Sequence, residues 1–139
     1  MKRKNIFRSS CPISTTLDIL GDKWSLLIIR DLAFKEKNTY GDFLNAGEGI
    51  ATNVLADKLV LLEQHGIISK GAHPDSGTKI LYKLTPKGID LIPTLVEIIL
   101  WSEKYHEVHE HATAFARMIK KDKAGSIKEL MHELKKKNA

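Results

Sequence analysis

Apolar residues recur at every third or fourth position through the first half of the chain, a spacing that places them on one face of a helix. The pattern predicts helices over residues 13–20, 23–34, 40–46 and 52–65. In the last of these, Leu55, Leu59 and Leu62 form one stripe suited to burial, and Gly66 follows as a C-terminal cap. Thr39 stands where an N-cap would begin the short helix before it.

The helical spacing then gives way to two short strands, predicted over 67–73 and 78–84. Residues 74–77, Pro-Asp-Ser-Gly, have the chemistry of the turn that would join them. A short helix, a glycine-containing turn, a longer helix and a hairpin in this order are typical of a winged helix-turn-helix. We therefore expect a mainly α protein with a small β-hairpin, in which helix 52–65 enters the major groove of DNA.

The second half of the chain is predicted to be helical. Thr85 and Pro86 are the N-cap and first residue of a typical helix start, and the apolar spacing predicts one long helix from there to about residue 109. Residues 112–137 predict one or two further helices. The expected break lies near Gly125, where Ser126 would cap the second piece.

Length and charge narrow the class of protein. The 139 residues, 42% of them hydrophobic, suffice for a winged-helix DNA-binding domain over 1–109 and a C-terminal helical extension over 110–139 that serves dimerisation. Lys and Arg number 22 against 17 Asp and Glu, a net charge of +5 that favours a polyanionic partner. Neither a membrane span nor a signal sequence is predicted, so the expected location is cytoplasmic.

The outward face of helix 52–65 supplies the candidate DNA contacts. Base contacts come from the N-terminal part of such a helix, and the residues expected to make them are Thr52, Asn53, Ala56 and Asp57. An Asn side chain pairs bidentately with adenine, and a Thr or Ala methyl contacts the thymine methyl. Lys58 projects sideways towards phosphate, while Lys70 and Lys79 flank the hairpin tip and would reach the DNA backbone or minor groove.

Several motifs resemble those of the HxlR-type winged-helix regulators, which are relatives of the MarR group. They are Cys11-Pro12-Ile13, Leu20-Gly21-Asp22-Lys23-Trp24, Ile28-Ile29-Arg30-Asp31-Leu32, the helix over 50–62 with Glu63 and Gly66, and Tyr82-Lys83-Leu84-Thr85-Pro86-Lys87-Gly88. The resemblance covers about residues 10–105. It implies a homodimer on a palindromic double-stranded DNA operator, with N- and C-terminal helices at the interface. Many such relatives respond to toxic electrophiles or oxidants.

The chain departs from the family pattern at three places. Ala51 replaces the usual Ser at the N-cap of helix 52–65, which removes a side-chain acceptor worth about 1 kcal/mol. Val60 and Leu61 occupy positions that are usually polar, and Val60 has either DNA or a neighbouring helix as its expected partner. Lys79 replaces an Arg after the wing turn, so bidentate recognition is less expected there.

Cys11 is the only cysteine, and two interpretations of it remain open. It precedes a helix start, where the helix dipole stabilises a thiolate, and Arg8 is near in sequence, so it is a candidate redox sensor. Alternatively, it is a small hydrophobic residue buried at the dimer seam. A small electrophile is the effector under the first interpretation, and an aromatic molecule bound between the dimer helices and the winged domain is a second candidate.

Other sites and functions are less supported. His106, His109 and His111 lie close in sequence to two glutamates, but their spacing is not that of a known zinc motif, and a solvated helix end is favoured. No phosphate-binding Gly-rich loop or hydrolase triad spacing is present, so we expect no cofactor, no metal and no enzyme activity. The alternatives are a winged-helix protein-interaction module without specific DNA binding and, less supported, a small enzyme.

Overall fold

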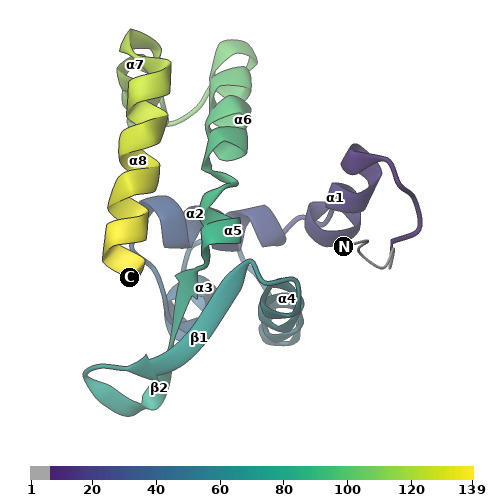
Figure 1. The fold of residues 1–139 in the computed structure, drawn as a ribbon. Helices are drawn as coiled ribbons and strands as arrows, with labels where there is room; N and C mark the ends of the chain where they lie inside the picture. Colours follow the sequence, from purple (N-terminus) through teal and green to yellow (C-terminus); the bar gives the residue numbers. More distant parts are fainter. Residues whose placement is uncertain (1–6) are drawn as a thin grey trace.

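The computed structural model describes residues 7–139 and confirms the mainly α winged helix-turn-helix (Figure 1). Its elements are α1 Pro12–Leu20, α2 Ser25–Phe34, α3 Tyr40–Leu44, α4 Thr52–Gln64, β1 Ile68–His73, β2 Ser76–Leu84, α5 Pro86–Ile89, α6 Ile92–Tyr105, α7 Glu110–Lys121 and α8 Lys123–Asn138. The two strands form an antiparallel hairpin in which Ile68 lies opposite Leu84. Within the described residues, none of the helices has the length and apolar character needed to cross a membrane.

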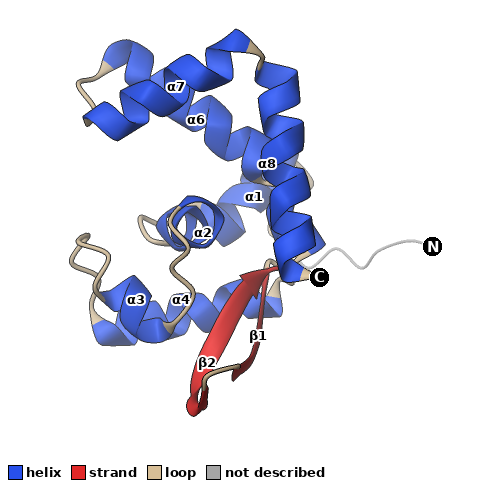
Figure 2. Cartoon of the chain, turned by 90° about the vertical axis from the view of Figure 1, so that its left-hand side faces the viewer, coloured by secondary structure: helices blue, strands red, loops and turns tan. Residues whose placement is uncertain are grey.

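The hydrophobic core lies around α2. Ile28, Ile29 and Leu32 of this helix are buried, together with Phe43 of α3 and the predicted leucine stripe of α4. Each fully buried side chain of this size contributes about 1.5–3 kcal/mol through removal of apolar surface from water. Figure 2 shows α2 between the helix-turn-helix and hairpin on one side and α6 and α7 on the other. The core therefore fixes α4 and the hairpin to one body.

The long helix predicted over 86–109 is wrong, because the chain forms two helices there. Asp90 ends α5 and Leu91 precedes α6, whose first turn contains Pro93. Proline has no backbone N–H to donate and its ring clashes with the carbonyl of the preceding turn, so it is tolerated in a first turn but not inside a continuous helix. His106 ends α6 in an extended conformation, three residues before the predicted end.

The break in the C-terminal extension also differs from the prediction. It lies at Asp122, between α7 and α8, rather than near Gly125. The Asp122 carboxylate accepts a hydrogen bond from the backbone N–H of Gly125 at 3.0 Å, so Asp122 is the N-cap. Ser126, which was expected to cap the second helix, lies inside its first turn instead.

The extension formed by α7 and α8 packs on its own chain. Ile119 and Leu134 are buried, and the ring of Phe115 contacts Phe34 of α2 edge-on, with ring centroids 5.4 Å apart. At its far end, the Asn138 side-chain amide donates to the Leu84 carbonyl oxygen at 3.1 Å. Helix α8 therefore runs from the outer end of α6 down to the base of the hairpin (Figure 1).

Candidate nucleic-acid interface

The short helix α3 begins with two reciprocal hydrogen bonds. The Thr39 hydroxyl accepts from the N–H of Asp42, and the Asp42 carboxylate accepts from the N–H of Thr39, each at 3.2 Å. Partial burial raises the pKa of Asp42, but its hydrogen bonds from Asn38 and Thr39 outweigh this and hold the pKa below its usual value. The predicted N-cap is confirmed, and the charged form of Asp42 is the one that stabilises it.

A turn with two left-handed glycines joins α3 to α4. Gly47 and Gly49 have φ values of +87° and +76°, which side chains other than glycine rarely tolerate. Ala51 is the N-cap of α4 and makes no side-chain cap bond, as its sequence predicts. The Tyr40 hydroxyl instead ties the two helices together by donating to the Thr52 carbonyl oxygen at 3.0 Å.

One face of α4 is buried and the opposite face is exposed. Leu55, Leu59 and Leu62 are the buried residues of this helix, which confirms the predicted stripe. The four residues expected to contact bases, Thr52, Asn53, Ala56 and Asp57, are all exposed. Val60 is 52% exposed and therefore does not fill a gap against a neighbouring helix of its own chain. The exposed face thus combines amide, hydroxyl, carboxylate and methyl groups.

Two of the predicted phosphate contacts are engaged in ion pairs within the chain. The Lys58 ammonium lies 3.8 Å from the Asp22 carboxylate, and the Lys70 ammonium lies 3.7 Å from the Glu63 carboxylate. Both distances are long and both pairs are partly exposed, so each is worth at most about 1 kcal/mol. A phosphate group can replace either carboxylate at little cost.

The two wing lysines predicted to contact DNA, Lys70 and Lys79, lie at different distances from the tip of the hairpin. Lys79 is exposed near the tip, and no ion pair joins it to another of the described residues. Lys70 lies opposite Tyr82, nearer the base of the hairpin. Figure 1 shows the hairpin projecting from the body beside α4. The side chain of Lys79 is therefore the more available of the two for DNA.

Two ion-pair networks that connect α2 to α4 and to the turn before it were not predicted from the sequence. Arg30 donates to the buried Asp31 carboxylate from Nε and Nη2, at 3.0 and 2.9 Å, and from Nη1 to Glu48 in the turn before α4, at 3.0 Å. Burial raises the pKa of Asp31, and the hydrogen bonds from Arg30 oppose that rise. Arg30 therefore connects the core helix α2 to the turn that sets the position of α4.

Asp22 forms the second network at the start of α2. Its carboxylate accepts from the N–H groups of Trp24 and Ser25, at 2.8 and 2.9 Å, and from the buried Ser25 hydroxyl at 2.5 Å. Burial alone would raise the pKa of Asp22, but these hydrogen bonds and the charge of Lys58 lower it. Pairing of Asp22 with Lys58 links this corner of the fold to α4.

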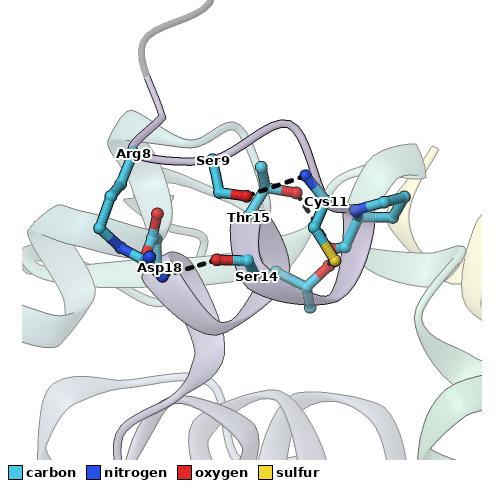
Figure 3. A network of polar contacts seen from close by, with 8 residues as sticks. Arg8, Ser9, Cys11, Ser14, Thr15 and Asp18 are labelled. Carbon is cyan, nitrogen blue, oxygen red and sulfur yellow. Dashed lines mark hydrogen bonds and ion pairs between the residues drawn. The ribbon is translucent and has the colours of Figure 1, made fainter.

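Cys11 is exposed and is the N-cap residue of α1, where its side chain makes no cap bond (Figure 3). The neighbouring Arg8 is directed elsewhere: it donates to the Ser14 hydroxyl at 2.6 Å and lies 3.8 Å from the Asp18 carboxylate. The thiol is therefore not buried by the described residues of its own chain, and burial at a dimer seam stays a prediction. The exposed position is compatible with chemical modification.

Of the histidines expected at a helix end, His106 and His109 lie between α6 and α7, and His111 lies in the first turn of α7. His109 caps α7, its Nδ1 accepting from the N–H of Ala112 at 3.1 Å, and its ring contacts that of His111. In the part of the chain that the structure describes, no three His, Cys, Asp or Glu side chains are grouped closely enough to hold a metal ion.

Large apolar side chains remain exposed on α1 and α6. Ile13 and Leu17 on α1 are 73% and 58% exposed, although their spacing predicted an ordinary amphipathic helix. On α6, Ile98, Trp101 and Tyr105 follow one another at helical spacing and are 44–61% exposed. Exposed apolar residues in such continuous stripes are typical of a surface that another molecule covers.

Comparison with known proteins identifies the family. The HxlR-like helix-turn-helix family matches residues 19–110. The HTH-type transcriptional regulator sll1512 of Synechocystis sp. is 38% identical over 86 residues, which are 62% of this chain and 63% of that protein, so the match spans slightly less than two thirds of the relative.

Two solved structures support the same assignment. The transcription factor PA1607 has a TM-score of 0.66 and 40% identity, and the match covers 74% of this chain and 70% of that one. The redox regulator HypR in its oxidized form has a TM-score of 0.62 and 28% identity, covering 70% of this chain and 100% of that one. The chain therefore belongs to the HxlR-like helix-turn-helix family of transcriptional regulators.

Proposed function

We propose that this protein is a sequence-specific regulator of transcription that binds a palindromic operator as a homodimer. The observation that carries the proposal is the exposed face of α4, which is held by a buried leucine stripe. Beside it projects a wing whose Lys79 forms no ion pair with any residue that the structure describes. An α-helix fits the major groove, and a basic wing tip suits the adjacent backbone or minor groove. Asn53 and Lys79 are assigned to base and phosphate contact, respectively.

The apolar stripes of α1 and α6 support the homodimer. A second copy of the chain would cover Ile13 and Leu17 together with Trp101 and its neighbours, removing these side chains from water. Because the apolar residues Ile119 and Leu134 of the C-terminal extension are already buried in their own chain, we assign the interface chiefly to α1 and α6. The two α4 helices of such a dimer would contact successive major grooves, about one helical turn apart.

Cys11 is assigned the sensing role within this function. It is exposed, it is the N-cap residue of the proposed interface helix α1, and a solved structural relative is named as a redox regulator. A chain with one cysteine can oxidise only by joining the thiol of a second molecule, either another copy or a small thiol, or by direct oxidation of its sulfur. Each product would add bulk or a cross-link beside α1.

Selection of bound duplexes from a random DNA pool tests the proposal. Wild type should enrich a palindrome, and its affinity should fall with salt at a log–log slope of about −0.9 per phosphate neutralised. The N53A variant should lose preference at one position of each half-site, whereas K79A should weaken binding to all duplexes alike. If no sequence is enriched and the affinity for DNA is independent of salt, the protein is an interaction module of another kind.

A further inference from the structure

The exposed face of α4 carries no positive charge. Lys58 is the only Lys or Arg in Thr52–Gln64, and it is directed aside to Asp22 at the α1–α2 corner. The other flank of the helix is occupied by Glu63, which pairs with Lys70 of the wing. A surface that binds phosphate needs cations. The central face of α4 therefore has the chemistry of contacts to base edges.

Asp57 lies at the centre of this face. At about 100° per residue, it is turned by about 140–200° from each of the three buried leucines. Its side chain is exposed, and among the described residues no side chain forms an ion pair with it. An unpaired carboxylate on a surface that meets a polyanion weakens binding unless the nucleic acid supplies a hydrogen-bond donor to it.

The major groove offers few such donors. Only cytosine N4 and adenine N6 carry amino groups on that edge, whereas guanine and thymine present acceptors. In adenine, the amino group lies beside the N7 acceptor, which repels the second oxygen of a carboxylate. Cytosine N4 has no acceptor on the same base at the groove edge.

We propose that Asp57 is a specificity-determining residue that accepts a hydrogen bond from the N4 amino group of one cytosine in each half-site. This inference rests on the proposed function, because it requires that α4 enters the major groove. Asp57 then lowers the affinity for every duplex that lacks cytosine at that position, so it creates specificity by penalising other sequences.

The test compares full-length wild type with D57N and with the control variant D75N. Asp75 is an exposed aspartate in the wing turn, so both variants gain the same charge. Affinities are measured at one salt concentration for the operator selected with wild type, for its single-base variants, and for a scrambled duplex. A further operator carries 2-pyrimidinone in place of the assigned cytosine. This removes the N4 amino group together with its Watson–Crick hydrogen bond to guanine, so the effect on wild type is read relative to the effect on D75N, which binds the same duplex.

D57N should bind the scrambled duplex more tightly than wild type does, yet lose about tenfold or more of the discrimination for cytosine at one position. Loss of the N4 amino group should weaken wild type by a similar factor and D57N by clearly less, because the neutral Asn amide oxygen is a weaker acceptor than the carboxylate. D75N should raise the affinity for all duplexes equally and keep every base preference.

The proposal is overturned if D57N keeps the wild-type preference at every position, or if its effect equals that of D75N. Failure of the wild type to select any operator would instead refute the proposed function itself. Thermal unfolding of both variants should match wild type because both aspartates are exposed, and a lowered midpoint of D57N would also count against the proposal.

Discussion

Replacement of Arg30 by Met should lower the free energy of unfolding, and with it the denaturant midpoint, and should weaken operator binding. Met keeps the aliphatic stem but removes the guanidinium that joins Asp31 to Glu48. Two charge-assisted hydrogen bonds to a carboxylate that is 3% exposed are then lost. Breaking a buried ion pair by removing one partner costs about 3–5 kcal/mol. Because the Arg30 side chain is 23% exposed and water can enter, we expect a loss near the lower end, about 3 kcal/mol.

The pH dependence of this loss follows from Asp31. Burial raises its pKa above the ordinary value of 3.8, so its contribution to stability is present below that value and declines as pH rises through the folded-state pKa. Without Arg30, the folded-state pKa rises further, and more stability is lost between acidic and neutral pH. The difference between wild type and R30M should therefore be largest at pH 7 and should narrow towards pH 4.

Urea unfolding at several pH values measures both effects. The control is E48Q, which removes the half-exposed partner of Arg30 and should cost less than about 1 kcal/mol. The double variant R30M/D31N removes the buried charge along with its partner and should be more stable than R30M at neutral pH. A deficit in R30M that equals that of E48Q, or that stays constant with pH, would refute the reasoning.

Three further predictions concern the interface, the thiol and the helix cap. W101E should shift the homodimer to monomer in sedimentation experiments and weaken operator binding. E107Q on the adjoining loop should leave the sedimentation mass at that of the dimer. A W101E dimer with wild-type operator affinity would contradict the assigned interface. Diamide should change the operator affinity of wild type but not that of C11S, and an equal response of both proteins would remove the sensing role of Cys11. T39A should lower the free energy of unfolding by about 1 kcal/mol through loss of the α3 N-cap, and a loss that is absent in chemical denaturation would show that the cap is not needed.

Local periodicity was sufficient to predict the helix-turn-helix and the hairpin. The stripe of Leu55, Leu59 and Leu62 repeats at helical spacing and is buried as expected, and Gly66 has the left-handed φ of +70° that a C-terminal cap position favours. The split between α5 and α6 was not predicted, although Pro93 marks it by interrupting an otherwise helical pattern. Apolar spacing alone does not report such a break.

Contacts between distant residues were not predictable in the same way. The pairs Arg30–Glu48 and Lys58–Asp22 join segments that only the folded chain brings together, and no repeat in the sequence marks them. The spacing of Ile13 and Leu17 predicted a helix but not which surface covers it, since burial depends on partners outside the local pattern. All assigned base contacts remain predictions that depend on the position of the DNA.

The attachment of α8 to the base of the wing links residues that are far apart along the chain. Lys137 pairs with Glu36 across 101 positions, and Asn138 holds the Leu84 carbonyl, both from a segment beyond the family match. Chain termini are among the first segments to open in local unfolding. Hydrogen exchange at the base of the hairpin should therefore follow the fraying of α8. The last turn of α8, distant from the wing in sequence, would then determine how rigidly the wing is held.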